Sequence, residues 1–195
     1  MIKKPILEEN EKVQKQIEIA RATEGFSHLT EKQQQIIKLS LYMQARGERY
    51  DTDENENILK VNKKSTQYVA DKNCHTSILN LENEDMTKAP GDVRTTKDFF
   101  EAKYSRVMNI SELKKQVEEF GFPCVIHVSS SPNEDFYSKD HSALVLGHNK
   151  ENTIVVWEKE GYEIQNPYRI TTLENIYKTF GTGYYYGLRK LRKNS

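Results

Sequence analysis

The chain has few cysteines and no long apolar run. Its 195 residues include only two cysteines, Cys74 and Cys124, which excludes a disulfide framework and favours a reducing compartment. No segment approaches the roughly 20 apolar residues that a membrane-spanning helix needs, and the charged N-terminal sequence lacks the apolar core of a secretory signal. We therefore expect a cytoplasmic protein, or one delivered by a route that is independent of a signal peptide.

An excess of charge of either sign is also absent. Lysine and arginine together number 29, and so do aspartate and glutamate, which gives a formal net charge of zero. Such a chain exerts no long-range attraction on nucleic acid or on an anionic membrane. The expected partner is a protein or peptide substrate, and neither nucleic acid nor membrane binding is predicted.

Several common site motifs are missing. The sequence has no glycine-rich phosphate loop and no Gly-x-Ser-x-Gly nucleophile elbow. A zinc site could in principle combine Cys124, His127, His141 and His148, but no pair of these residues has the short spacing of common zinc sites. Cys124 lies inside an apolar run and is predicted to be a small buried residue. We expect neither a metal nor an organic cofactor.

The first third of the chain is predicted to be helical. Apolar residues recur at helical spacing from about 8 to 22, before Gly25. Thr30 and Gln33 form a capping-box pattern at the start of a second helix, for which Gly47 is a plausible end. The polar segment 51–57 is predicted to be a loop. It divides the chain into an N-terminal helical extension, 1–50, and a main domain, 51–195, although both could form one continuous domain.

The second half favours β-strands. Short β-branched runs, typical of buried strands, alternate with polar turns, and the basic tail from Arg189 is expected to fray. We predict a helix over 111–120 with Ser111 as its cap, strands over 123–128, 142–147 and 153–158, a helix over 173–180 and a strand over 184–188. This order indicates an α+β fold in which N-terminal helices pack on an antiparallel sheet.

Cys74 is the candidate nucleophile. A polar turn precedes it, and Ile78, Leu79 and Leu81 follow it at a spacing that a helix would bury. In the first turn of a helix, backbone N–H groups and the helix dipole favour the thiolate, the form that attacks a carbonyl carbon. The alternative is a small buried apolar residue.

His141 and Glu158 are the candidate base and its orienting carboxylate. His141 begins one apolar strand, and Glu158 ends the next strand along the chain. A carboxylate there could accept the proton of the imidazole nitrogen that faces away from the thiol. Glu160 and Asn166 compete for this role, and the alternative for both His141 and Glu158 is a surface position at a strand end.

The order of these residues resembles the papain-like cysteine peptidase superfamily. The phrase His-Ser-Ala-Leu-Val-Leu-Gly (141–147), followed by Thr-Ile-Val-Val-Trp-Glu (153–158), is similar to the CHAP-type cell-wall amidases and the double-glycine leader peptidases. The resemblance covers roughly residues 65–165. It implies a papain-like fold, a catalytic triad of Cys74, His141 and Glu158, and an oxyanion hole.

The resemblance also suggests which groups form the oxyanion hole and where the chain departs from the family. The backbone N–H of Cys74 and one side-chain donor would form the hole, with Gln67 as the candidate donor and Asn73 as a weaker one. The family usually places a small residue after the cysteine, whereas this chain has His75. That histidine could crowd the cleft, bind substrate or act as a second base.

These features lead to a functional hypothesis with two alternatives. The leading hypothesis is a cysteine hydrolase, such as a bacterial effector protease, that cleaves an amide, peptide or isopeptide bond through a thioester acyl-enzyme. One alternative is a non-catalytic protein-binding module on the same fold, suggested by His75 and the unmatched N-terminal helices. The other is a cysteine-dependent transglutaminase or deamidase.

Overall fold

The computed structural model describes residues 4–42, 49–52, 58–61, 74–84, 102–129, 141–160, 168–180 and 185–192. Helices come first along these residues and strands dominate the second half, as the sequence predicts. The helices are α1 (Lys4–Arg21), α2 (Glu24–Ser27), α3 (Glu31–Tyr42), α5 (Cys74–Glu82), α7 (Ile110–Phe120) and α8 (Leu173–Phe180). The strands are β1 (Arg49–Thr52), β2 (Ile58–Val61), β3 (Lys103–Arg106), β4 (Cys124–Ser129), β5 (His141–His148), β6 (Ile154–Lys159), β7 (Tyr168–Thr172) and β8 (Tyr185–Lys190).

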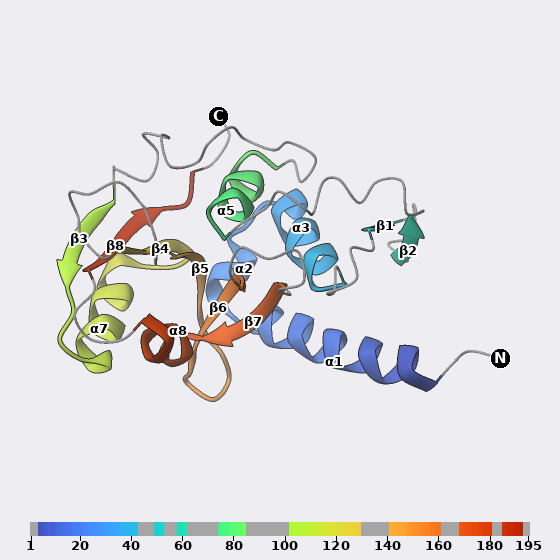
Figure 1. Ribbon diagram of the computed structural model, residues 1–195, viewed down its shortest axis with the longest axis horizontal. Coiled ribbons are helices and arrows are strands. Elements are labelled where there is room, and N and C mark those ends of the chain that lie inside the picture. Colours follow the sequence, from blue (N-terminus) through green and yellow to red (C-terminus); the bar gives the residue numbers. More distant parts are fainter. Residues whose placement is uncertain are drawn as a thin grey trace.

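A six-stranded sheet forms the centre of the molecule (Figure 1). Its strands lie in the order β3-β8-β4-β5-β6-β7, and every neighbouring pair is antiparallel. Strand β8 is the last strand in the sequence, but it lies inside the sheet between β3 and β4. Strands β1 and β2 form a separate antiparallel pair beside α3. The fold is therefore α+β with an antiparallel sheet.

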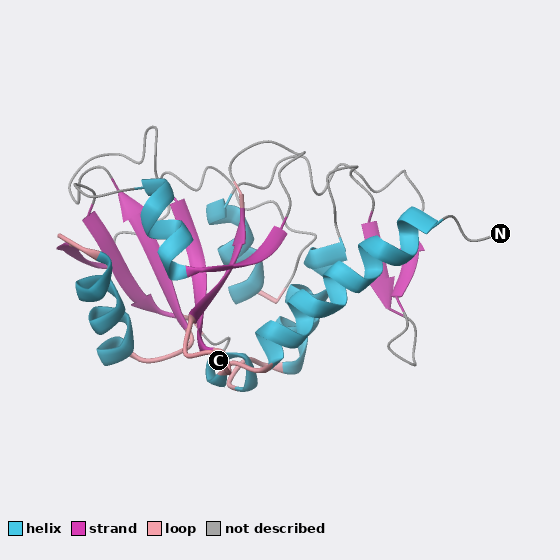
Figure 2. Ribbon diagram, turned by 90° about the horizontal axis from the view of Figure 1, so that it is seen from below, coloured by secondary structure: helices cyan, strands magenta, loops and turns pink. Residues whose placement is uncertain are grey.

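Helices cover both faces of this sheet (Figure 2). Because side chains alternate along a strand, β6 directs Val155 and Trp157 into one apolar cluster and Ile154 and Val156 into another. The first cluster joins the sheet to α1, α2, α3 and α5, and the second joins it to α7 and α8. The N-terminal helices thus share a core with the sheet, while the boundary predicted at residue 50 stays a prediction.

The two predicted helix caps have different outcomes. Gln33 N–H donates to Thr30 Oγ1, and Thr30 N–H donates to Gln33 Oε1, each at 3.1 Å, so the capping box is confirmed. The prediction for Ser111 is wrong. The cap of α7 is Asn109, whose side chain accepts from the N–H of Glu112 at 2.9 Å, because the helix begins at Ile110, one residue earlier than the pattern suggested.

Two other local predictions are corrected by tertiary contacts. Gly25 does not lie at the end of α1, which ends at Arg21; it lies in the short helix α2, where a Cβ would collide with the backbone of β5. Residues Asp51 and Thr52 belong to β1 and not to a loop, because they pair with β2. Residues 53–57 and Gly47 lie outside the described residues.

The start of the basic tail is also ordered. Arg189 is in β8 and 5% exposed, so its predicted fraying is wrong. Its guanidinium forms a two-pronged ion pair with Glu82 at the end of α5, at 2.5 and 3.0 Å. Charge burial is tolerated when the partner charge and hydrogen bonds come with it, and only the fold supplies that partner.

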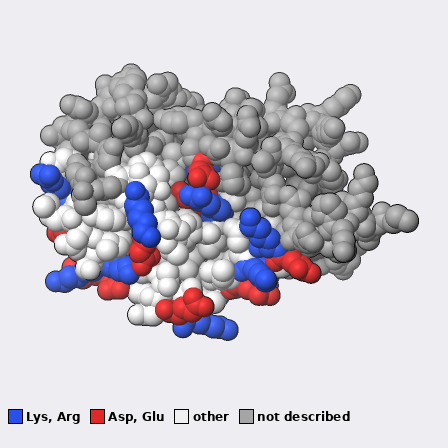
Figure 3. Space-filling view, turned by 60° about the horizontal axis from the view of Figure 1, so that its bottom comes forward, with Lys and Arg blue, Asp and Glu red and all other residues white. Residues whose placement is uncertain are grey.

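Surface charge and helix hydrophobicity both follow from the composition of the chain. On the face shown in Figure 3, basic and acidic side chains are interspersed over the described residues. Some charges of opposite sign form ion pairs, such as Lys114 with Glu174 at 2.5 Å. Among the described residues, no helix combines the length and the hydrophobicity that crossing a bilayer requires.

Candidate active site

Cys74 is the first residue of α5, the position that the sequence predicted for it. All nine residues of this helix are buried, and Cys74 itself is 2% exposed. The helix packs on the face of the sheet at β5 and β6. Because Cys74 begins the helix, the positive end of the helix dipole lies at this residue and favours the thiolate.

His141 and Glu158 lie on one face of the sheet, next to Cys74. In the β5–β6 register Leu144 is opposite Trp157, which places Glu158 diagonally across from His141 because residues two apart on a strand share a face. The Nε2 atom of His141 lies 2.5 Å from Glu158 Oε2. Since Nε2 faces the carboxylate, Nδ1 is the ring nitrogen left for the hydrogen bond between His141 and the Cys74 thiol.

Two further residues hold this pair in place. Arg169 of β7 donates from Nε to Glu158 Oε1 at 2.8 Å, and its NH2 atom lies 2.7 Å from the same oxygen. The ring of Phe180, the last residue of α8, stacks on the imidazole of His141 with centroids 4.9 Å apart and planes 19° apart. The carboxylate is thus oriented by Arg169 and the imidazole by Phe180.

The electrostatics favour a charged thiolate–imidazolium pair. Burial alone would raise the pKa of Cys74, but the charges of His75 and His141 outweigh it and hold that pKa well below its ordinary value. Burial would lower the pKa of His141, but the charge of Cys74 and then Glu158 raise it to about 9. Both shifts favour the state in which the sulfur carries the negative charge and His141 carries the proton.

The second cysteine has the opposite environment. Cys124 is fully buried in β4, as predicted. Burial raises its pKa to about 12, with only a small opposing effect from the charge of Lys190. The chain therefore contains one activated thiol and one inert thiol.

A second group of polar side chains lies beside Cys74. His75, the next residue of α5, is 3% exposed, and its Nδ1 lies 2.8 Å from Ser142 Oγ. The same hydroxyl lies 2.7 Å from Nδ1 of His127 in β4. The rings of His75 and His127 are 5.2 Å apart. His75 is therefore part of a buried network and does not protrude as a free side chain.

A buried lysine completes the charges around the thiol. Lys159 of β6 is 1% exposed, and its ammonium lies over the ring of Tyr168 at 5.8 Å from the centroid. Burial lowers its pKa, whereas the charges of Cys74 and Glu160 oppose that effect. A positive group near the sulfur stabilises the thiolate further.

Four further residues were candidates for the site. Glu160 pairs with Arg169 NH1 at 3.1 Å, whereas the carboxylate beside His141 Nε2 is that of Glu158. Gln67, Asn73 and Asn166 lie outside the described residues. No cluster of three or more histidine, cysteine or acidic side chains placed to hold a metal occurs in the described parts of the chain.

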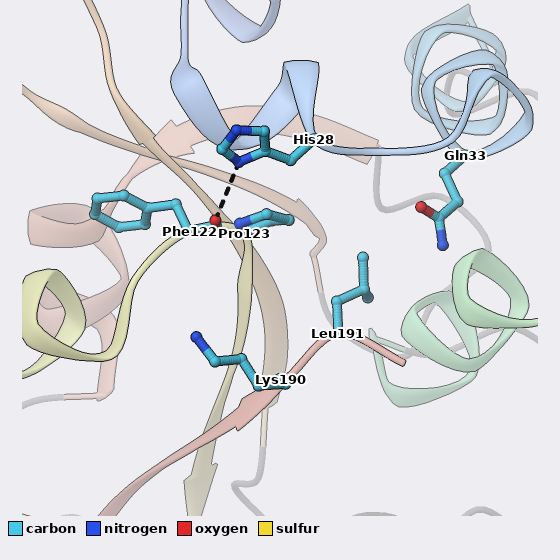
Figure 4. Close-up of a pocket in the computed structure, with 6 residues that line it drawn as sticks. All are labelled: His28, Gln33, Phe122, Pro123, Lys190 and Leu191. Carbon is cyan, nitrogen blue, oxygen red and sulfur yellow. Dashed lines mark hydrogen bonds between the residues drawn. The ribbon is translucent and has the colours of Figure 1, made fainter. Parts of the chain in front are cut away.

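A separate pocket lies at the end of the sheet away from His141, and Figure 4 shows the side chains that line it. It has a volume of about 200 Å³ and lies where β4 begins and β8 ends, whereas His141 is paired with Val128 near the other end of β4. Its lining consists of His28, Gln33, Phe122, Pro123, Lys190 and Leu191. These six side chains include no thiol, hydroxyl or carboxylate, so the pocket offers no nucleophilic triad.

Sequence reasoning missed Arg169, Phe180 and the Ser142–His127 pair. Neither Arg169 nor Phe180 belongs to a site motif; the pairing of β7 with β6 brings Arg169 to Glu158, and the packing of α8 on the sheet brings Phe180 to His141. Ser142 had one usable signal, since it follows the candidate base directly in the strand.

Comparison of the chain with protein-family models, with curated proteins and with solved structures gives no match.

Proposed function

We propose that the protein is a cysteine hydrolase with a papain-like arrangement, which cleaves an amide, peptide or isopeptide bond. The observation that carries this proposal is the convergence of three buried groups from separate elements. Cys74 begins α5, His141 begins β5, and Glu158 lies on β6 with its carboxylate 2.5 Å from the His141 ring. This arrangement supplies a nucleophile, a base and an orienting group.

The first chemical step forms a thioester. The Cys74 thiolate attacks the carbonyl carbon of the scissile bond, and the resulting oxyanion collapses as the carbon–nitrogen bond breaks. The His141 imidazolium gives its proton to the leaving amine. The backbone N–H of Cys74 is a donor for the oxyanion, and Gln67 remains the predicted second donor. One such donor contributes about 3 kcal/mol to transition-state stabilisation.

The second step restores the enzyme. Neutral His141 takes a proton from water, which attacks the thioester, breaks the carbon–sulfur bond and releases a carboxylic acid, so that the Cys74 thiolate and the His141 imidazolium are restored. Glu158 stabilises the imidazolium that starts the first step and that forms again in the second. If an amine replaced water, the same acyl-enzyme would yield a transferase product, as in the transglutaminase alternative.

The architecture around the triad supports a papain-like assignment. A buried helix carries the cysteine at its first residue and packs on an antiparallel sheet. The histidine and the carboxylate follow on two adjacent strands of that sheet, in the chain order cysteine, histidine, acidic residue. This order matches the resemblance seen in the sequence.

The chain contains its own control for a test of the nucleophile. Cys74 and Cys124 are both buried, so burial alone gives no reason for different reactivity. We expect iodoacetamide at pH 6 to alkylate Cys74 at least tenfold faster than Cys124, measured by peptide mass spectrometry, because only Cys74 is ionised there. Equal, slow labelling of both thiols would contradict the proposal.

Hydrolysis itself can be tested without a known substrate. Peptide vinyl sulfones and a proteome-derived peptide library are incubated with the wild-type chain and with the Cys74→Ala and His141→Ala variants. The proposal predicts a covalent adduct on Cys74 and new peptide termini with the wild-type chain only. Cleavage that persists in Cys74→Ala would exclude this residue as the nucleophile.

A further inference from the structure

The sulfur of Cys74 has two imidazole neighbours. His141 hydrogen-bonds to it from β5, and His75 hydrogen-bonds to it from the next position of α5. The triad accounts for His141 only. His75 is held by a different set of residues, so its placement requires an explanation of its own.

Ser142 is the centre of that second set. Its hydroxyl lies 2.8 Å from Nδ1 of His75 and 2.7 Å from Nδ1 of His127. Ser142 and His127 are 0% exposed, and His75 is 3% exposed. The ring of Tyr104 meets the ring of His127 edge-on, with centroids 5.9 Å apart. Hydrogen bonds in such a buried place cost much to break, so they restrict the rings strongly.

The hydroxyl also restricts where protons can be. A serine hydroxyl donates one proton and accepts others, so at least one of the two Nδ1 atoms must carry a hydrogen. Burial lowers the pKa of His127 well below its usual value, and the charges of His75, His141 and Arg189 act in the same direction, which keeps His127 neutral. A neutral His127 can donate Nδ1–H to Ser142 while Ser142 donates its own proton to Nδ1 of His75, which leaves Nε2–H of His75 as the proton available to the sulfur.

We propose that Ser142 and His127 are positioning residues that hold His75 as a second hydrogen-bond donor to the Cys74 sulfur. The thiolate is then stabilised from two sides, by His141 with Glu158 and by His75 with Ser142 and His127. This inference rests on the proposed function, because it assigns these residues to the activation of the same nucleophile.

Other charged groups face the cluster and must stay constant in any test. They are Glu158 and Lys159 from β6 and Arg189 from β8, besides Tyr104 from β3. Substitution of Ser142 changes none of these groups. Substitution of Ser142 therefore removes the second arm of the site, the hydrogen-bonded chain of His127, Ser142 and His75, without altering the formal charge.

The sharpest comparison is Ser142→Thr against Ser142→Val. The two side chains have nearly the same shape, and only threonine keeps the hydroxyl. The thiolate of Cys74 is titrated by its absorbance at 240 nm and by the pH dependence of iodoacetamide alkylation. We expect Ser142→Val to raise the Cys74 pKa by about one unit and to slow alkylation at pH 6 about tenfold. Ser142→Thr should stay close to the wild-type chain.

The outcomes separate this inference from the proposed function. If the wild-type Cys74 has an ordinary thiol pKa, both fail. If the wild-type pKa is low but the valine and threonine variants titrate alike, the second arm is overturned and the triad stands. Thermal unfolding of each variant shows whether a change in reactivity is only a loss of folded protein.

A measurement on the unmodified chain covers the case in which both variants unfold. Histidine side-chain ¹⁵N spectra of the wild-type protein are followed as Cys74 titrates. The proposal predicts that the ring signals of His75 change at the pH of the thiol titration, as those of His141 do. A His75 ring that does not respond to the charge on the sulfur would overturn the proposal.

Discussion

The carboxylate of Glu158 has two cationic partners in a buried place, because His141 meets one of its oxygens and Arg169 the other. Burial alone would raise the pKa of Glu158, but the hydrogen bond and charge of His141, followed by Arg169, lower it. Glu158 therefore stays ionised through the neutral range. A permanently charged carboxylate favours the protonated form of His141 and so the thiolate of Cys74.

Replacement of Glu158 by glutamine tests this coupling. Glu158→Gln keeps the shape of the side chain and removes its charge, so the imidazolium loses stabilisation. We expect the pKa of His141 to fall from about 9 by about one unit and the pKa of Cys74 to rise. Histidine ¹⁵N spectra and thiolate absorbance at 240 nm measure the two shifts.

Glu160→Gln is the matched control for that variant. Glu160 also binds Arg169, through NH1 at 3.1 Å, and its side chain is 46% exposed. Its removal takes the same charge from the neighbourhood without touching the His141 contact. We expect little change in either pKa. Equal shifts in the two variants would mean that net charge, and not the Glu158 contact, sets the state of the pair.

The residues of the triad were predictable because each carries a local signal. Cys74 precedes an apolar segment of helical spacing, and His141 and Glu158 each border a β-branched run. The Ser142–His127 contact has no such signal, because it depends on the β4–β5 register, which sets Ser142 opposite His127. Arg169 depends likewise on β7 pairing with β6. Neither pairing is encoded by nearby residues.

At the scale of elements, α5 is attached to the sheet at both ends. Its first residue contacts the β5 histidine, and its last residue, Glu82, binds Arg189 of β8 through both oxygens. Both side chains of this ion pair are 5% exposed. A buried pair with two hydrogen bonds fixes the direction of a helix more strictly than apolar contacts do.

Loss of one partner from this buried pair should be costly. Glu82→Gln removes the carboxylate charge from a buried guanidinium, and we expect it to lower the free energy of unfolding by roughly 3 kcal/mol. Urea denaturation followed by tryptophan fluorescence measures the change. Glu119→Gln is the comparison, because Glu119 forms an exposed pair with Lys115 at 3.8 Å and should change stability by about 0.5 kcal/mol or less. Similar values for both variants would refute a structural role for the Glu82–Arg189 pair.

Strands differ in how well their sequences predict them. The runs within β4, β5 and β6 are almost wholly buried, so they are apolar and β-branched, which is a strong signal. Strands β3 (Lys-Tyr-Ser-Arg) and β7 (Tyr-Arg-Ile-Thr-Thr) are the two edges of the sheet and are half-buried. Their polar side chains obscure the pattern, so both were missed.

At the scale of the whole molecule, the N-terminal helices complete the core on one face of the sheet. Helices α1 to α3 and the segments that join them supply half of the apolar cluster that covers Leu144, Leu146 and Trp157. The indole Nε1–H of Trp157 donates to Ser40 Oγ of α3 at 3.0 Å. Trp157 is the single tryptophan of the chain, so its fluorescence reports directly on whether these helices are docked.

A cooperative core predicts that a defect in a helix also exposes the buried thiol of Cys124 in the sheet. Ile37 of α3 is 0% exposed, and Ile37→Ala should lower the free energy of unfolding by about 3 kcal/mol, because it leaves a cavity against the sheet. The urea midpoints for Trp157 fluorescence and for protection of Cys124 from alkylation should fall together. Ile19→Ala in α1, at a position that is 40% exposed, should change both by much less. If Ile37→Ala left the Cys124 midpoint unchanged, the helices would be a separate unit, because a two-state core gives every buried probe the same transition.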